Sequence, residues 1–373
     1  IVFAEPGQSV KRHIRSPRTE QKHNVVIVLM ESMSSKFLTE NRYPGQPVIT
    51  PTLDRLSKEG LFFSRTYASG TRSVRGIEAV NLSIPPLPGQ SIVRRPGNEN
   101  LHGLGSVFAE KGYDNKWIYG GYGYFDNMNA FLGGNGFRVV DRTAWADGEI
   151  TFANAWGAAD EDTFAKVIKE ADKSYASGKP FLTLLLTISN HRPYTYPSGK
   201  VSLTGGREGG VQYADYAIGE FLRRAESKPW FDNTIFVFVA DHTAGAAGDE
   251  EIDLEGHHIP WIIYAPKLVK ARRIDMPVSQ LDVLPTLLGL LNFDYESRFY
   301  GQDALSPDYE SRFFVSNFQK IGYVKNGAGV ILKPVRDYAV LPAGTQPPHV
   351  QTLLDEAVAF YQSASHWKHF LKK

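Results

Sequence analysis

The sequence predicts an α/β fold in which a mostly parallel sheet is sandwiched between helices, with a small antiparallel sheet region at the C-terminal side. Two observations carry this prediction. Continuous apolar runs rich in β-branched residues recur along the chain, and segments with helical spacing separate them. Uninterrupted apolar runs are typical of strands buried on both faces, as in parallel sheets. Their alternation with helices favours a sheet that is covered on both sides.

The predicted elements follow one another in a regular order. The run NVVIVLMES (24–32) is the first strong strand, and DEDTFAKVIKEADKSYASG (160–178) is a long amphipathic helix. In all, we expect strands at 24–32, 61–70, 115–121, 179–189, 233–241 and 259–266, and helices at 50–60, 106–113, 160–178 and 211–227. After about residue 300 the runs become short. They predict small antiparallel strands over 312–334 and a terminal helix over 352–373.

We expect one main domain with an appendage. The division is an N-terminal linker or extension (1–23), a core (24–300), and a C-terminal small sheet and helix of the same domain (301–373). No apolar run reaches the roughly 20 residues that span a bilayer, and the first residues are too polar for a signal peptide. A chain that begins at Ile1 reads as a processed or truncated fragment, with any targeting segment upstream.

Composition excludes several kinds of chemistry. The chain has no cysteine, which excludes thiol nucleophiles, disulfides and Cys-ligated metals, and suits an oxidising compartment such as a periplasm. With 41 basic and 40 acidic residues, it carries no overall charge that would indicate nucleic-acid binding. The reaction must therefore use oxygen and nitrogen groups.

Polar residues stand where several apolar runs end. Glu31 follows VVIVLM, Thr71 follows a strand and Gly70, His191 follows FLTLLLTISN, and Asp241 and His242 follow IFVFVA. Ligands of open α/β sheets bind beyond the carboxyl ends of the strands. A single carboxylate at a strand end is more often a helix cap or a solvated side chain than a ligand. Together, two carboxylates, imidazole and a hydroxyl predict a site for a hard divalent cation.

Four segments, in this order, carry a family resemblance: NVVIVLMES, SGTRSVRG, ISNHRPY and VADHTA. They resemble the signature segments of the alkaline-phosphatase/sulfatase superfamily, in particular the lipoteichoic acid synthase-like phosphoglycerol transferases. The resemblance covers most of residues 24–290. It implies one divalent cation, Mn²⁺ in the first place with Mg²⁺ or Zn²⁺ as alternatives, held by Glu31, Thr71, Asp241 and His242.

The resemblance also implies that Thr71 is the nucleophile. Coordination to a cation lowers the pKa of a hydroxyl, and a helix that starts after Thr71 would direct its N–H groups at a phosphate. Gly70 allows the tight turn before it. Ser73 stays open as a second hydroxyl. Arg75 either contacts the substrate or pairs with a structural carboxylate.

Further site residues follow from the same resemblance. His191 matches a histidine that contacts the transferred phosphoryl group, and either His257 or His258 matches a histidine of the related phosphoethanolamine transferases. The stretch 117–131 departs from the family pattern of a tryptophan and an arginine at the glycerol phosphate. Phe125 and Asn127 stand there instead, either as a substrate wall or as a packing loop.

The function implied is transfer of a phosphoglycerol head group from phosphatidylglycerol to an envelope glycan or lipid acceptor, through a covalent threonine intermediate. The domain would work on the periplasmic face of the inner membrane, tethered by upstream transmembrane helices. Alternatives are a phosphoethanolamine transferase, a phosphodiesterase or sulfatase-like hydrolase, and a non-catalytic lipid-binding regulatory domain. A sulfatase is disfavoured, because no cysteine is present and SIPPL (83–87) lacks the arginine of its motif.

Overall fold

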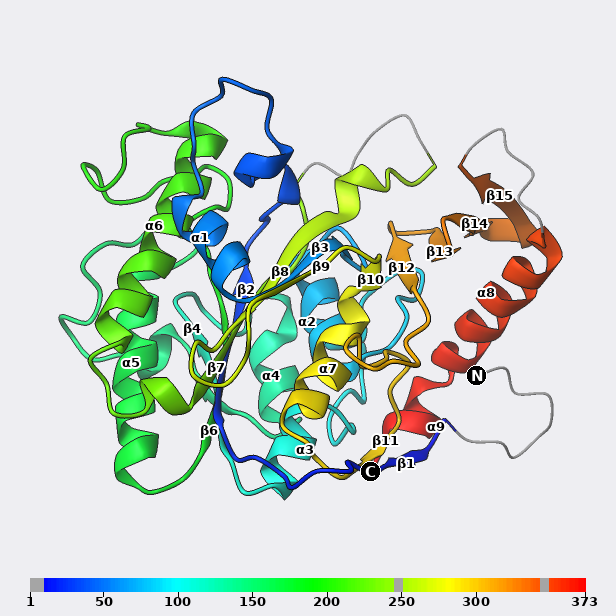
Figure 1. Ribbon diagram of the computed structural model, residues 1–373, viewed down its shortest axis with the longest axis horizontal. Helices are drawn as coiled ribbons and strands as arrows, with labels where there is room; N and C mark the ends of the chain where they lie inside the picture. Colours follow the sequence, from blue (N-terminus) through cyan, green and yellow to red (C-terminus); the bar gives the residue numbers. More distant parts are fainter. Residues whose placement is uncertain (1–9, 245–250, 343–348) are drawn as a thin grey trace.

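The core of the protein is a sheet whose strands run across the middle of the molecule (Figure 1). The computed structural model describes residues 10–244, 251–342 and 349–373. Within them the strand order is β10-β3-β8-β7-β2-β6-β4-β5, with β9 paired to β3. The bounds are β2 Asn24–Met30, β3 Leu61–Tyr67, β4 Asp114–Tyr119, β5 Arg138–Val140, β6 Phe181–Leu186, β7 Thr234–Ala240, β8 His258–Tyr264, β9 Arg272–Ile274 and β10 Val278–Ser279.

Most neighbouring strands of this sheet are parallel, as predicted. β2 pairs in parallel with β6 and β7, and β4 with β5 and β6. Every residue of β2, β6 and β7 is buried, which explains their uninterrupted apolar sequences. β8 is the exception, since it runs antiparallel to both β3 and β7. In the described part of the chain, no α-helix separates β7 from β8, and an antiparallel neighbour needs no helical crossover.

Helices cover both faces of the sheet (Figure 1). α1, α5 and α6 pack on one face, and α2, α3, α4 and α7 lie on the other. The bounds are α1 Pro51–Glu59, α2 Ser73–Leu82, α3 Leu104–Glu110, α4 Met128–Gly133, α5 Asp160–Ala176, α6 Gly206–Ala225 and α7 Val283–Leu290. α6 begins five residues before the predicted start at residue 211. The sequence pattern missed these residues because three of the first five are glycines, which are poor helix formers. A Cβ on Gly209 would lie 2.1 Å from the Tyr196 hydroxyl, so glycine permits this close approach.

The C-terminal part forms the predicted antiparallel sheet and helix. Strands β12 (Arg312–Ser316), β13 (Ile321–Lys325), β14 (Ala328–Lys333) and β15 (Asp337–Leu341) pair in sequence order. Helices α8 (Val350–Ser365) and α9 (Trp367–Leu371) follow, and α8 packs on β13 and β14.

The N-terminal segment is attached to the domain. β1 (Arg12–Ile14) pairs with β11 (Tyr295–Ser297), whereas residues 1–9 of the predicted extension lie outside the described residues. The division at residues 23 and 300 stays a prediction. Among the helices that the structure describes, none has the length and apolar character needed to cross a bilayer.

Candidate active site

Three predicted metal ligands meet at the carboxyl edge of the sheet. Met30 and Ala240 are register partners at the ends of β2 and β7, so Glu31 and Asp241 emerge side by side. His242 follows directly. One ligand atom from each of the three lies within 4.8 Å of the others. His242 Nε2 is 3.8 Å from Glu31 Oε1 and 3.6 Å from Asp241 Oδ2, and all three residues are buried.

The hydrogen bonding of Asp241 fits a cation. Its Oδ1 accepts from the backbone N–H groups of Ser32 (2.8 Å) and His242 (2.7 Å). Its Oδ2 is buried and has no hydrogen-bond partner among the described residues. A buried carboxylate oxygen without a donor, beside a second carboxylate, is costly unless a cation binds it. Two carboxylates and an imidazole are a suitable set for one divalent cation.

The pKa values of Asp241 and His242 also favour a bound cation. Burial, and then the nearby Glu31 carboxylate, raise the pKa of Asp241 above its usual range. Burial lowers the pKa of the His242 imidazole, but Asp241, Glu31 and the Thr243 carbonyl raise it, and the net shift is upward. Both groups hold protons more tightly because the cluster concentrates negative charge away from water. A divalent cation would relieve the same excess charge.

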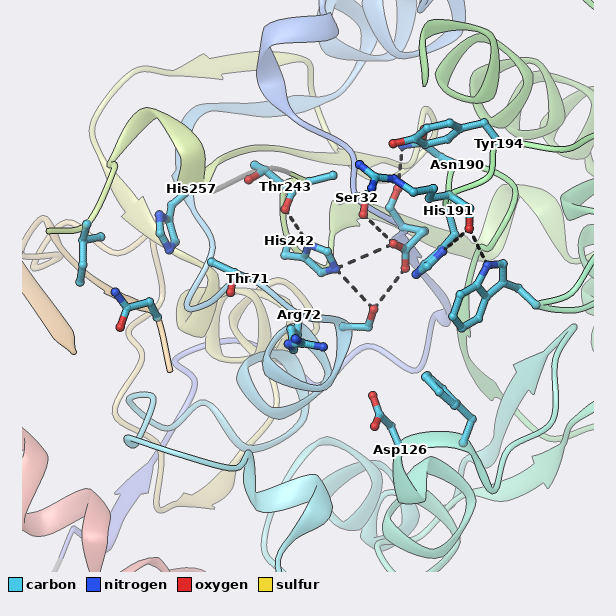
Figure 2. A pocket seen from close by; sticks show the side chains of 18 of the residues that line it. Ser32, Thr71, Arg72, Asp126, Asn190, His191, Tyr194, His242, Thr243 and His257 are labelled. Carbon is cyan, nitrogen blue, oxygen red and sulfur yellow. Dashed lines mark hydrogen bonds and ion pairs between the residues drawn. The ribbon is translucent and has the colours of Figure 1, made fainter. Parts of the chain in front are cut away.

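The hydroxyl that reaches this cluster belongs to Ser73. Ser73 is the first residue of α2, and its Oγ donates to Glu31 Oε2 (3.2 Å) and lies 3.5 Å from His242 Nε2. Thr71 lines the same cavity, but its hydroxyl makes no hydrogen bond to the cluster within the described residues. Figure 2 places Thr71 to the side of the His242 ring. In the structure the hydroxyl against the cluster is therefore that of Ser73, the second hydroxyl that the sequence left open, and the role of Thr71 as ligand and nucleophile stays a prediction.

A close backbone contact fixes the start of α2 against the cluster. A Cβ on Gly76 would lie 2.4 Å from the carbonyl oxygen of Asp241, so only glycine fits there. The Gln280 side chain holds the same region from another side. Its Nε2 donates to the carbonyls of Ala240 (2.8 Å) and Asp241 (2.9 Å), and its Oε1 accepts from the N–H of Ser69 (3.0 Å).

Arg75 is a structural residue. Its guanidinium is buried, pairs with Glu78 (Nη1 to Oε1, 2.9 Å), and donates to the carbonyls of Leu87 and Gly89. Of the two alternatives that the sequence left open, the structure favours pairing with a structural carboxylate over a substrate contact, because this position of α2 faces the interior. Arg72 is exposed and lines the cavity instead, directly before the helix.

The aromatic stretch contributes to the cavity, but not through both predicted residues. Phe125 lines the cavity, as predicted. Asn127 does not line the cavity and donates to the carbonyl of Val93 (2.8 Å), which favours the packing loop over the substrate wall for this residue. Asp126 and Asn127 both have left-handed backbones (φ 51° and 63°), and in this tight turn Asp126 is the residue that reaches the cavity. Asp126 also forms an ion pair with Arg94 (3.2 Å).

His191 lies where the sequence predicted it. It lines the cavity opposite Thr71 in Figure 2, and its ring centroid is 3.8 Å from that of Trp156. Its Nδ1 lies 2.9 Å from the Arg192 carbonyl, which favours a proton on Nδ1 and leaves Nε2 for a ligand. The preceding Asn190 ties this loop to β2, since its Nδ2 donates to the Glu31 carbonyl (2.9 Å).

The structure also separates His257 from His258. His257 is buried and lines the cavity, with Nδ1 2.7 Å from the Asp253 carbonyl and Nε2 3.2 Å from that of Ser316. Burial lowers the pKa of His257. His258 lies outside the cavity lining. Its Nε2 is 2.7 Å from the Ser64 carbonyl, and its ring stacks on Tyr67.

The cavity has a volume of about 720 Å³ and opens to solvent. Besides the residues above, it is lined by polar groups that the sequence analysis did not select: Ser32, Arg192, Tyr194, Thr243, Glu251 and Asn317. Ser32 donates to Glu31 Oε1 (2.6 Å). Because Ser32 directly follows Glu31 at the end of β2, its place in the sequence could have predicted it as a cavity residue. Trp156 and Asn317 come from loops without apolar periodicity.

Known proteins share this fold and parts of this sequence. Curated relatives named phosphoglycerol transferase I are 27% identical: the one from Citrobacter koseri over 245 residues (59% of this chain and 31% of that protein), and the one from Salmonella paratyphi B over 268 residues (65% and 33%). The chain thus spans about a third of the length of these relatives.

Solved structures and a family model extend the comparison. A crystal structure of an alkaline phosphatase superfamily protein from Vibrio parahaemolyticus matches all of this chain and 94% of that chain, with a TM-score of 0.91 and 32% identity. The lipoteichoic acid synthase LtaP from Listeria monocytogenes shares the fold, with a TM-score of 0.80 and 18% identity over 99% of this chain and 96% of that chain. The family model described as Sulfatase matches residues 23–293. The chain therefore belongs to the Sulfatase family, within the alkaline phosphatase superfamily.

Proposed function

We propose that this domain transfers a phosphoglycerol head group from phosphatidylglycerol to an acceptor hydroxyl, through a covalent ester on Ser73. One observation carries the proposal: the Ser73 hydroxyl, at the first residue of α2, lies against the Glu31–Asp241–His242 cluster. Such an arrangement activates a weak nucleophile at a helix N-terminus, where an anion is favoured. The name of the curated relatives supports phosphoglycerol as the transferred group.

Glu31, Asp241 and His242 would hold one divalent cation, with Mn²⁺ proposed first and Mg²⁺ or Zn²⁺ as alternatives. When bound, such a cation lowers the pKa of the hydroxyl and neutralises charge on the phosphodiester. The other groups come from the chain. The backbone N–H groups of Ser73 and Val74 have no partner within α2, as in the first turn of any helix. With Arg72 at the cavity wall, they can bind the phosphate oxygens.

In the first step, Ser73 Oγ attacks phosphorus, and Glu31 Oε2 is the carboxylate oxygen positioned to take its proton. The bond between phosphorus and the diacylglycerol oxygen breaks, and that oxygen takes a proton from an imidazole. The imidazole proposed for this role is that of His191, protonated at the start of the step, because it lines the cavity and its Nε2 has no hydrogen-bond partner among the described residues, whereas both ring nitrogens of His257 already face backbone carbonyls. Diacylglycerol leaves, and glycerophosphate remains esterified to Ser73.

In the second step, an acceptor hydroxyl attacks the same phosphorus. The proton of the acceptor hydroxyl passes to the imidazole that gave up a proton in the first step. Ser73 Oγ leaves the phosphorus and recovers its proton from Glu31. The acceptor is proposed to be an envelope glycan or glycolipid. The domain would then work on the periplasmic face of the inner membrane, tethered by transmembrane helices that precede this segment.

A second head group is favoured by one wall of the cavity. Phe125, Asp126 and Trp156 stand together near Ser73, and the rings of Phe125 and Trp156 meet edge to face at 5.6 Å. The Asp126 carboxylate can accept hydrogen bonds from the two glycerol hydroxyls. The same carboxylate beside aromatic faces also suits an ammonium group, as in phosphoethanolamine. Phosphoethanolamine transfer is therefore the second candidate.

The deciding experiment is mass spectrometry of the protein, acid-quenched after incubation with Mn²⁺ and phosphatidylglycerol. We expect a glycerophosphoryl adduct, and fragmentation of its peptide should place it on Ser73. Ser73→Ala should carry no adduct, whereas the matched variant Thr71→Ala should keep it. An adduct on Thr71 would return the nucleophile to that residue.

The same assay distinguishes the alternatives. An adduct only from phosphatidylethanolamine would retain the mechanism and change the head group. No adduct from either lipid, although about one cation is bound per chain, would contradict covalent transfer and favour the non-catalytic lipid-binding domain.

A further inference from the structure

Several large apolar side chains are exposed around the C-terminal sheet. Phe318 is 64% exposed, Val335 98%, Tyr338 43% and Tyr361 37%. We call these four residues the apolar rim. Three of them line a groove of about 780 Å³ between α8 and the β14–β15 hairpin, and Phe318 adjoins Gln319 of the same groove. Exposed apolar side chains that gather in one place, unlike scattered ones, indicate an interaction surface.

The backbone at Val335 is strained in a way that projects this side chain outward. Val335 and Arg336, between β14 and β15, both have left-handed backbones (φ 64° and 58°). A β-branched residue is a genuine outlier in this region, where glycine or asparagine is common. Because the side chain is 98% exposed, burial within the described protein cannot offset that strain. An exposed valine in this conformation suggests a contact outside the chain.

Basic side chains surround the apolar rim. Arg336 is exposed and has no ion pair among the described residues. Lys320 and Lys333 both pair with Glu251, and Lys333 also pairs with Asp337 (2.7 Å). Arg336 thus adds to the groove a positive charge that no carboxylate of the described residues pairs with. The surface therefore complements a negatively charged partner.

The apolar rim is continuous with the active-site cavity. Asn317 lines the cavity, whereas Gln319, two residues later, lines the groove. Glu251 lines the cavity and lies 3.5 Å from Lys333 Nζ, and Lys333 lines the groove. A partner seated on the apolar rim would thus lie next to the mouth of the cavity.

We infer that the apolar rim docks on the interface of a bilayer that contains anionic phospholipids. Aromatic and aliphatic side chains that enter the interfacial region, beside basic groups that face anionic head groups, are the chemistry of peripheral membrane binding. Docking there presents the cavity to lipid head groups. The consequence for transfer rests on the proposed function, whereas docking itself does not.

Vesicle flotation tests the docking. The wild-type domain should float with vesicles of phosphatidylcholine and phosphatidylglycerol, and less with phosphatidylcholine alone. Because burying an apolar side chain contributes to membrane affinity, the double variant Phe318→Ser/Val335→Ser should lose about tenfold or more in partitioning. Arg336→Glu should weaken binding only where phosphatidylglycerol is present. Tyr175→Ser, at a 48% exposed tyrosine on α5, is the matched control and should bind as the wild type does.

Val335→Gly separates docking from folding. Glycine relieves the left-handed strain, so this variant should melt no lower than the wild type and still lose vesicle binding. The inference is overturned if the wild type does not float with anionic vesicles, or if the rim variants float as it does. It is also overturned if light scattering shows that the rim joins two copies of the chain and that the variants only dissociate them.

A substrate comparison links docking to transfer. With phosphatidylglycerol in vesicles, the rim variants should form the Ser73 adduct at least about tenfold more slowly, in line with their lost partitioning. With short-chain phosphatidylglycerol dispersed as monomers, they should match the wild type. Vesicle binding without any adduct would contradict the proposed function alone, whereas equal adduct rates on vesicles would contradict the inference.

Discussion

The two walls of the active-site cavity are built in different ways. One wall consists of residues at strand ends: Glu31 is 3% exposed, Asp241 0% and His242 8%, and backbone groups hold them in place. The opposite wall comes from loops. Phe125 is 45% exposed, and its neighbour Asp126 is held by an ion pair to Arg94, which is itself 45% exposed.

This difference indicates a division of labour. Buried groups in a low-dielectric setting, fixed by the sheet, suit charge stabilisation that must not reorganise during the reaction. Exposed loop residues make weaker and more variable contacts, which suit the selection of a head group. Changes in the strand-end wall should therefore affect the chemistry, and changes in the loop wall should affect substrate preference.

The largest effect is expected at the strand-end wall. Asp241→Asn should lower adduct formation at Ser73 by about a thousandfold or more, since a cation site contributes several kcal/mol to transition-state stabilisation. The variant should also lose the rise in Tm that Mn²⁺ gives the wild type. Without metal it should melt no lower than the wild type, because it removes one of two repelling carboxylates. A metal-dependent rise in Tm that persists in Asp241→Asn would contradict the assigned ligands.

The next effect concerns the packing that joins α2 to the cluster. Gly76→Ala should lower the free energy of unfolding by about 1–3 kcal/mol, because its Cβ would lie 2.4 Å from the Asp241 carbonyl oxygen. Displacement of Ser73 should also reduce adduct formation. Gly133→Ala in α4 is the control, since the nearest atom to its Cβ would be at 3.5 Å. Chemical denaturation should show no loss there, and equal losses in both variants would contradict the packing argument.

A pH effect tests how rigidly the strand-end wall is supported. Asp160 is buried at the start of α5, where it accepts hydrogen bonds from the N–H groups of Ile188 (2.8 Å) and Ser189 (3.2 Å), just before His191. Burial raises the pKa of Asp160 to about 6, above an unfolded value near 3.8. Between these values the folded state binds more protons, so stability is greatest below the lower pKa and falls as pH rises through the upper one.

Asp160→Asn should remove this contribution. The free energy of unfolding of the wild type relative to the variant should fall by about 2–3 kcal/mol between pH 4 and pH 7, by linkage over the pKa difference. Denaturation curves at several pH values measure it. A constant difference between the two proteins across that range would show that the carboxyl titrates alike in both states.

The sequence predicted the strand-end wall better than the loop wall, for a physical reason. Long apolar runs define buried strands, and the polar residue after each run must emerge at the same edge. Glu31, Asp241 and His242 follow from that rule. The choice of hydroxyl does not follow from it, because a decision between Thr71 and Ser73 requires the first residue of α2 to be known, and helix ends are the least certain feature of a sequence pattern.

The direction of side chains and the contacts between loops were still harder to predict from the sequence. Arg75 turns inward because of its phase on α2, and Asn127 because of a left-handed turn, neither of which the composition reveals. Trp156 and Asp126 line one pocket although 30 residues of chain separate them, and no periodic signal indicates this. Such contacts depend on tertiary packing, which a local pattern does not contain.

The smallest effect is expected at the loop wall and would sharpen the contrast most. Asp126→Asn and Phe125→Ala should leave Tm and metal binding unchanged, since both side chains lie at the cavity wall rather than in the core. They should raise KM for the lipid donor by about tenfold, because each variant loses one or two hydrogen bonds or a ring contact with the donor. The value of kcat should change little. Asp126→Asn should weaken an ethanolamine donor more than a glycerol donor, because an amide can still bond hydroxyls but cannot neutralise an ammonium group. A fall in kcat as large as that of Asp241→Asn would show that the two walls act as one unit, and that the division between chemistry and selection does not hold.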